Sequence, residues 1–145
     1  MSETIVLDAS ITISWLLSPQ PVKQSEQVRR AIESGMKAVA PPNWRSRVMQ
    51  ACVEAEGSGR IRPSYTNRAF TLLDQLPIGI EQSYTPSHLS NWFRIARENQ
   101  LDIDRASFVE LALRKALPLA SIDTAVVKAA ELMGVSLFQE TQPVR

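Results

Sequence analysis

Short apolar runs recur along the chain, and residues that break regular structure separate them. The first run, TIVLD, is β-branched and apolar up to its last residue, which is typical of a parallel strand buried on both faces. The run LPLASID has a similar character and also ends on an aspartate. By this pattern we expect strands at residues 4–8, 37–41, 78–81, 117–123 and 135–138.

Between these runs, apolar residues recur every three or four positions, which is the spacing of one helix face. SPQP at 18–21 and GSG at 57–59 interrupt the pattern. Asp104 stands at the start of one helical segment as a suitable N-cap. We expect helices from residue 11 to the break at 18–21 and at 25–34, 43–56, 63–76, 85–100, 104–116 and 124–133.

Strands that alternate with helices predict an α/β domain, in which helices cover both faces of a mostly parallel sheet. We therefore expect a three-layer αβα architecture with four or five strands. A chain of 145 residues that is 44% hydrophobic can form one continuous core but is too short for two ordinary domains. We expect a single domain over residues 1–138 and a loosely held C-terminal tail at 139–145.

The charge and cysteine content exclude several classes of protein. Sixteen basic and fifteen acidic residues give a formal net charge of +1, so nucleic-acid binding would need a local basic patch. One cysteine, Cys52, and one histidine, His88, leave no internal disulfide and no Cys/His zinc cluster. We also find neither a secretory leader nor an apolar run long enough to span a membrane. We expect a cytoplasmic protein with no membrane partner.

Two aspartates, Asp8 and Asp123, are the last residues of predicted strands. The carboxyl ends of parallel strands meet at one edge of a sheet, where α/β proteins bind their ligands. Two carboxylates brought together there repel each other, raise each other's pKa and attract a cation. Each aspartate could instead be the N-cap of the helix that follows it. A cation site and a pair of helix caps are both consistent with the pattern.

Two arginines lie on apolar helix faces. Arg47 and Arg105 each fall on the apolar stripe of a predicted helix, whereas Arg45 projects about 200° away from Arg47 at 100° per residue. An unpaired guanidinium on a core-facing stripe is costly. Each arginine therefore either extends along the surface to reach solvent or meets a carboxylate. The inward carboxylates available are those of Asp8 and Asp123.

Three long segments resemble a known family, in the same order and at the same spacing. These segments are IVLDASITISWLL, APPNWRSRVMQACVEAEGSGRI and LDIDRASFVELALRKALPLASIDTAVVKAAELMGVSLF. Together they resemble the PIN domain of VapC-type toxins over nearly the whole chain. The resemblance implies a metal-dependent endoribonuclease fold, in which acidic residues hold one or two Mg²⁺ or Mn²⁺ ions that activate water for phosphodiester hydrolysis.

The acidic positions of that family fall on Asp8, Arg47, Arg105 and Asp123 of this chain. By resemblance, Asp8 and Asp123 are the catalytic and metal-binding positions, while the other two have changed sign. Arginine offers only hydrogen-bond donors and stays protonated, so it cannot be a metal ligand. We expect Arg47 and Arg105 to bridge the two aspartates in place of the metal. Four nearby carboxylates could compensate only with a change of helix register, namely Asp102, Asp104, Glu110 and Glu54.

Two functions from different classes follow. The first is a PIN-fold protein that is catalytically impaired and acts by binding RNA or a partner, since arginines can hold a phosphate backbone that they do not cut. The second is an active Mg²⁺-dependent endoribonuclease toxin that uses Asp8 and Asp123. The resemblance also implies a VapB-like antitoxin and a homodimer. The ligand count favours the first function.

A third class, a plain interaction module, would use the aromatic and apolar side chains of Trp15, Leu16, Trp92 and Phe93 on its surface. Packing in the core is the more usual role of such residues. A basic rim for RNA is also suggested by one helix residue and one loop. Its members would be Arg45, Arg60 and Arg62, although a solvated loop has the same composition.

Overall fold

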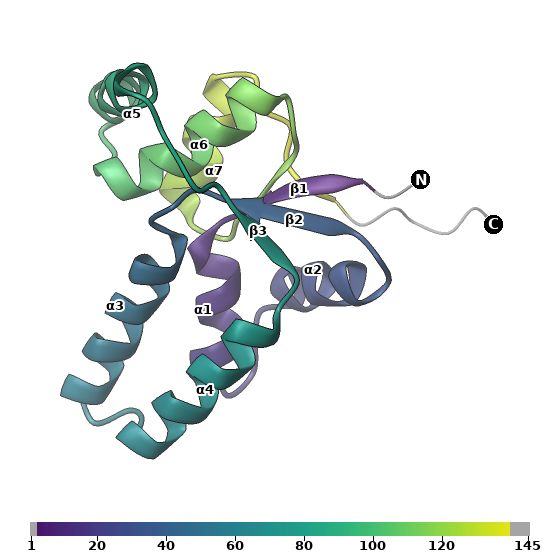
Figure 1. The fold of residues 1–145 in the computed structure, drawn as a ribbon, viewed down its shortest axis with the longest axis vertical. Coiled ribbons are helices and arrows are strands. Elements are labelled where there is room, and N and C mark those ends of the chain that lie inside the picture. The colour runs from purple at the N-terminus through teal and green to yellow at the C-terminus, as the bar shows by residue number, and fades with distance from the viewer. Residues whose placement is uncertain (1–2, 140–145) are drawn as a thin grey trace.

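The structure is a computed structural model that describes residues 3–139, and this part of the chain contains seven helices and four strands (Figure 1). The four strands form one sheet, all parallel, in the order β3-β2-β1-β4. Their bounds are Thr4–Leu7 for β1, Lys37–Ala40 for β2, Ile78–Ile80 for β3 and Leu119–Ala120 for β4.

The helices cover the sheet on both faces, with α1 to α4 on one side and α5 to α7 on the other (Figure 1). Right-handed crossovers between parallel strands produce this division, because the chain moves from β1 outward to β3 and then returns past β1 to β4. The predicted three-layer αβα architecture is confirmed. The helices span Ala9–Leu17 (α1), Lys23–Glu33 (α2), Trp44–Gly57 (α3), Pro63–Gln75 (α4), Pro86–Asn99 (α5), Ile103–Lys115 (α6) and Thr124–Leu132 (α7).

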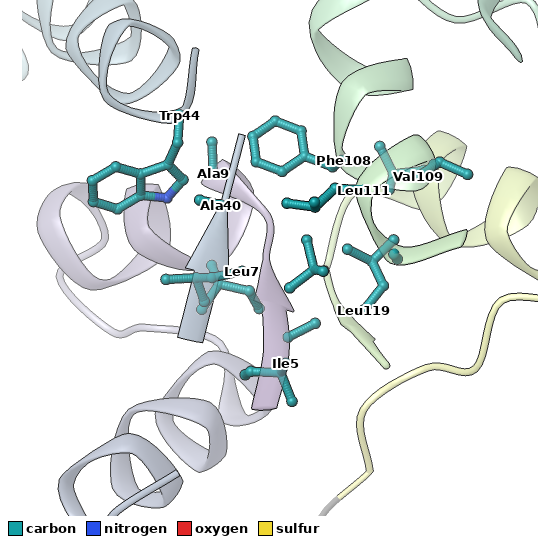
Figure 2. Packing of buried hydrophobic residues seen from close by; sticks show 14 of the residues in the cluster. Ile5, Leu7, Ala9, Ala40, Trp44, Phe108, Val109, Leu111 and Leu119 are labelled. Atoms are coloured by element: carbon teal, nitrogen blue, oxygen red, sulfur yellow. The ribbon is translucent and has the colours of Figure 1, made fainter. Parts of the chain in front are cut away.

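Strand β1 lies at the centre of the core. Ile5, Val6 and Leu7 have no exposed surface, as expected for a strand with helices on both sides. Figure 2 shows Trp44 on the α1 and α3 side of the strands, and Phe108 on the α6 side. Both side chains are buried, and they hold the first turns of α3 and α6 against the carboxyl end of the sheet.

The last two predicted strands are shorter than expected. The strand predicted at 117–123 is reduced to Leu119–Ala120, and the one predicted at 135–138 is a single parallel bridge between Leu119 and Leu137. Pro118 has no backbone N–H with which to extend β4. The chain also leaves the sheet directly after Ala120 to form the loop that carries Asp123.

Aromatic and apolar side chains divide between the core and the surface. Trp92 is 6% exposed and Leu16 is 8% exposed, whereas Phe93 is 53% exposed, so the expectation of core packing is wrong for Phe93. Phe93 carries the guanidinium of Arg97 over its ring, at 4.4 Å from the ring centroid. Within residues 3–139, no helix is long and apolar enough to cross a membrane. The predicted tail lies outside the described residues except for Gln139.

Candidate functional site

A cleft of about 300 Å³ opens at the carboxyl end of the sheet. Adjacent strands β1 and β4 lead into helices on opposite faces, α1 and α7, so the chain separates at this point and leaves a crevice. Asp8, Arg47, Arg105 and Asp123 all line this cleft. The structure therefore brings together the four positions that the sequence singles out, from segments more than a hundred residues apart.

Asp8 is the deepest of the four, with 4% of its surface exposed. Its Oδ2 atom accepts hydrogen bonds from the hydroxyl groups of Ser10, at 2.5 Å, and Ser121, at 2.8 Å. It also caps α1 by accepting from the backbone N–H of Ser10. Burial raises the pKa of Asp8; the two hydroxyl groups oppose this shift, and the charge of Asp123 adds to it.

Asp123 is the N-cap of α7 and an ion-pair partner at the same time. Its Oδ1 atom accepts from the backbone N–H groups of Ala125 and Val126, at 3.0 and 3.3 Å. Its Oδ2 atom accepts from Nε of Arg105 at 2.7 Å. Asp8 and Asp123 are therefore both helix caps and both line the cleft, while the cation site between them stays a prediction.

Arg105 connects two carboxylates. Besides the contact with Asp123, its Nη1 atom donates to Oδ2 of Asp102 at 2.6 Å. The hydrogen bond with Asp123 is the main cause that raises the pKa of Arg105, opposed by burial. The predicted pairing of an arginine with a strand-end aspartate is thus confirmed for Arg105 and Asp123.

The prediction that both arginines bridge both aspartates is wrong for Arg47 and Asp8. Within residues 3–139, the only ion-pair contact of Arg47 runs from its Nη1 atom to Oδ2 of Asp102, at 3.9 Å. Asp8 instead accepts hydrogen bonds from the hydroxyl groups of Ser10 and Ser121. Ser10 lies in the first turn of α1, and Ser121 lies in the loop after β4. Most of the N–H groups of the Arg47 guanidinium therefore remain available as donors within the cleft.

Asp102 has a role that the sequence did not predict, since it was expected only to precede the helix and instead pairs with Arg105. It is the N-cap of α6, where Asp104 was expected, and its Oδ1 atom accepts from the backbone N–H of Arg105 at 2.8 Å. The signal was present in LDIDR, because an N-cap side chain bonds the backbone N–H of the third helical residue. Asp104 instead accepts a hydrogen bond from the Asn43 amide, which joins the starts of α3 and α6.

Three other carboxylates stay outside the cleft. Asp104 and Glu54 are not among the residues that line it. Glu110 is buried beside α5, where it accepts from Trp92 Nε1 at 3.2 Å and from Arg114 Nε at 2.8 Å. Among the described residues, no group of three or more His, Cys, Asp or Glu side chains is placed to hold a metal ion.

The predicted basic rim is divided between two places. Arg45 lies in the first turn of α3 and forms an ion pair with Asp74. Arg60 and Arg62 follow the far end of the same helix and line a different pocket. A helix of 14 residues separates them, which corresponds to about 20 Å at 1.5 Å per residue.

Comparison with solved structures identifies the fold. The crystal structure of PAE2754 from Pyrobaculum aerophilum matches 89% of this chain and 86% of that chain, with a TM-score of 0.67 and 16% sequence identity. The chain has a PIN-like fold of the VapC type. This confirms the fold that the sequence resemblance predicts.

Two further structures agree with this PIN-like fold. FitAcB from Neisseria gonorrhoeae matches 93% of this chain and 96% of that chain, with a TM-score of 0.59 and 16% identity. FitAB bound to an IR36 DNA fragment matches 92% and 93%, with a TM-score of 0.60 and 12% identity. No protein-family model matches the chain, and no curated protein matches it.

Proposed function

We propose that this protein is a VapC-like PIN protein whose cleft is closed to divalent metal by arginine, so that it is catalytically impaired and acts by binding RNA or a partner. The observation that supports this most directly is the position of the Arg105 guanidinium. It bonds Asp123, the last acidic position of the PIN-like site, and Asp102 together. A guanidinium there supplies the positive charge that a metal ion would otherwise supply.

The donors and acceptors of the cleft do not fit a divalent cation as they are arranged. Mg²⁺ requires about six oxygen ligands in near-octahedral geometry. The Oδ2 atom of Asp8 takes two hydroxyl donors, and Asp123 takes two backbone amides and a guanidinium. Arg47 adds a second guanidinium to the lining. We therefore assign no catalytic step to a metal ion in this chain.

The same cleft is suited to holding a phosphate group. Arg47 has a single ion-pair contact within the described residues, a long one, and its side chain is 27% exposed. The first turns of α3 and α6 carry the two arginines, and helix N-termini add a partial positive charge. Charge-assisted hydrogen bonds from such groups bind a nucleic-acid backbone without reading its sequence.

The expected partners follow from the VapC-type resemblance. We propose a VapB-like antitoxin, a homodimer and a cytoplasmic location, which the single buried cysteine suits. One structural neighbour, FitAB, is described as bound to a DNA fragment. RNA is the nucleic acid that we propose for this chain, because the resemblance is to ribonucleases.

The test is to restore the two acidic positions in one variant, Arg47→Glu with Arg105→Asp. The unchanged chain should show no Mg²⁺-dependent RNA cleavage and no rise in thermal midpoint with millimolar Mg²⁺ or Mn²⁺. The restored variant should gain both, because a ligand that binds only the native state raises its stability. A matched control, Arg29→Glu with Arg94→Asp, changes the charge equally at exposed positions and should gain neither.

The alternative is an active Mg²⁺-dependent endoribonuclease that uses Asp8 and Asp123. It is favoured by one observation, since no ion pair is found for Asp8 within residues 3–139 and the residue lines the cleft with Asp123. In that case the unchanged chain would be stabilised by metal and would cleave RNA, and Asp8→Asn would abolish both effects. Either result in the unchanged chain would refute the impaired-site proposal.

A further inference from the structure

A second pocket lies at the opposite end of α1 from the cleft. It has a volume of about 510 Å³ and is bounded by the end of α1, the loop between α3 and α4, and the first turns of α4. Asp8 caps one end of α1 and Leu17 ends the other, so about 14 Å of helix separates the two sites at 1.5 Å per residue. We call this second pocket the arginine pocket. The polar and aromatic side chains that line it are Arg60, Arg62, Arg68, Tyr65, Ser18 and Ser64.

Three guanidinium groups gather in the arginine pocket without a carboxylate. Arg60, Arg62 and Arg68 are all exposed, and no acidic residue lines the pocket. None of the ion pairs found within residues 3–139 involves any of the three. Water screens exposed charges, but three guanidinium groups around one pocket still create a local positive potential that attracts anions. The pocket is therefore complementary to a ligand rich in negative charge.

Capping of nearby helix ends does not account for these arginines. Helices α1 and α3 both end beside the pocket, and cations can stabilise helix C-termini. However, the last carbonyl groups of α3 already accept from the backbone N–H groups of Ser58, Gly59 and Arg60. The carbonyl of Leu16 in α1 accepts from the hydroxyl group of Tyr65. The guanidinium groups thus remain available for an external acceptor.

Tyr65 gives the pocket a fixed aromatic surface. Its hydroxyl group is bonded to α1, which holds the side chain in place, while 39% of the residue stays exposed. Grooves that combine arginines with an aromatic ring on which a base can stack are typical of single-strand nucleic-acid binding. An acidic peptide would pair with the arginines equally well. It would find no sheet edge to extend here, because the pocket is bounded by helices and a loop.

We propose that the arginine pocket binds single-stranded nucleic acid, with the guanidinium groups on consecutive phosphates and a base stacked on the Tyr65 ring. Ser18 and Ser64 add hydroxyl groups beside the backbone path. A pocket of this size accommodates one splayed nucleotide rather than a duplex. This proposal does not rest on the function assigned to the cleft, since neither metal nor cleavage enters it.

The test measures binding of a fluorescently labelled oligouridine RNA of about 12 nucleotides to the intact chain, at about 50 mM salt without divalent metal. Replacing Arg60, Arg62 and Arg68 together by Ser should weaken binding at least about tenfold. The slope of log affinity against log salt should also fall by about 2, at about 0.7 per phosphate contact. Tyr65→Ala should weaken binding about tenfold by removing the stacking surface. If that variant fails to fold, the arginine variant decides alone.

The matched control replaces Arg29, Arg30 and Arg94 by Ser, which removes the same charge from exposed positions outside the pocket. Its affinity should stay within about twofold of the unchanged chain. An equal loss in the control would overturn the proposal, because the binding would then reflect overall charge. Tighter binding of a labelled polyglutamate peptide than of the RNA, lost in the arginine variant, would overturn it in favour of an acidic peptide. Absence of RNA binding by the unchanged chain would also overturn it.

Discussion

The Nε atom of Arg105 lies 2.7 Å from Oδ2 of Asp123, so an arginine near the start of α6 binds the residue that caps α7. One carboxylate thereby serves two elements, with Oδ1 on the backbone of α7 and Oδ2 on the guanidinium. The contact joins two helix N-termini at the mouth of the cleft. It also engages the Oδ2 atom of Asp123, a residue that lines the cleft.

Separating this pair should cost a measurable but modest amount of stability. Because the Arg105 side chain is 34% exposed, solvent screens the interaction, and we expect Arg105→Ala to lower the free energy of unfolding by about 1 kcal/mol. A double-mutant cycle with Asp123→Asn, which keeps a good N-cap, isolates the pair. Urea unfolding should give a coupling energy of about 0.5–1 kcal/mol. A coupling indistinguishable from zero would show that the contact is not energetically significant.

Asp8→Asn should stabilise the protein at neutral pH. Burial raises the pKa of Asp8 above its ordinary value of 3.8, so the folded chain holds this proton more tightly than the unfolded chain. Ionising Asp8 as the pH rises above 3.8 therefore lowers stability, and this loss is absent in the asparagine variant. Asparagine keeps an acceptor for the two serine hydroxyl groups and for the cap of α1.

The measurement is the thermal midpoint of both proteins from pH 4 to pH 7.5. The variant should have the higher midpoint at pH 7.5, and the difference should shrink as the pH falls towards 3.8. Such a gain is common where a residue serves function at the expense of stability. This account would be contradicted if the difference in thermal midpoint, variant minus unchanged chain, were smaller at pH 7.5 than at pH 4.

Glu110 should be one of the most sensitive polar positions outside the cleft. It is 3% exposed and accepts from both Trp92 and Arg114. Glu110→Ala removes the bonds from both side chains and leaves the indole N–H without its partner, which should cost about 3 kcal/mol in urea unfolding. Glu110→Gln keeps an acceptor for Trp92 and should cost about half as much. An equivalent loss for the exposed Glu98→Ala would rule out burial as the cause.

Two phenylalanines should differ in how much they contribute to the stability of the fold. Phe108 is 1% exposed and packs between α6 and the carboxyl end of the sheet, so Phe108→Ala should cost about 3–5 kcal/mol. Phe93 is 53% exposed and contacts Arg97, so Phe93→Ala should cost less than about 1 kcal/mol. Urea unfolding of both variants tests this ordering. Similar losses would mean that Phe93 is buried in solution, for example by a second copy of the chain.

Helices were more predictable from the sequence than strands and caps. An amphipathic helix repeats its pattern over several turns, so α3 and α5 lie within a residue or two of their predicted ranges. A strand exists only where a neighbour pairs with it, and β4 keeps two of its seven predicted residues because only Leu119 and Ala120 pair with β1. The cap of α6 depends on where α5 ends, at the left-handed Gln100, which places Asp102 before the first turn.

The sequence by itself determined the α/β class and the placement of Asp8 and Asp123 at strand ends, which follow from local periodicity. Its resemblance to VapC-type toxins added the PIN-like fold and the two acidic positions that carry arginine. Only the tertiary structure decided which partner each charged group takes. Arg105 reaches Asp123 and Asp102, whereas Asp8 is held by two serine hydroxyl groups and Arg47 keeps donors free. The physical reason is that hydrogen bonds form over about 3 Å, and the orientations of four helices set the distances between these side chains.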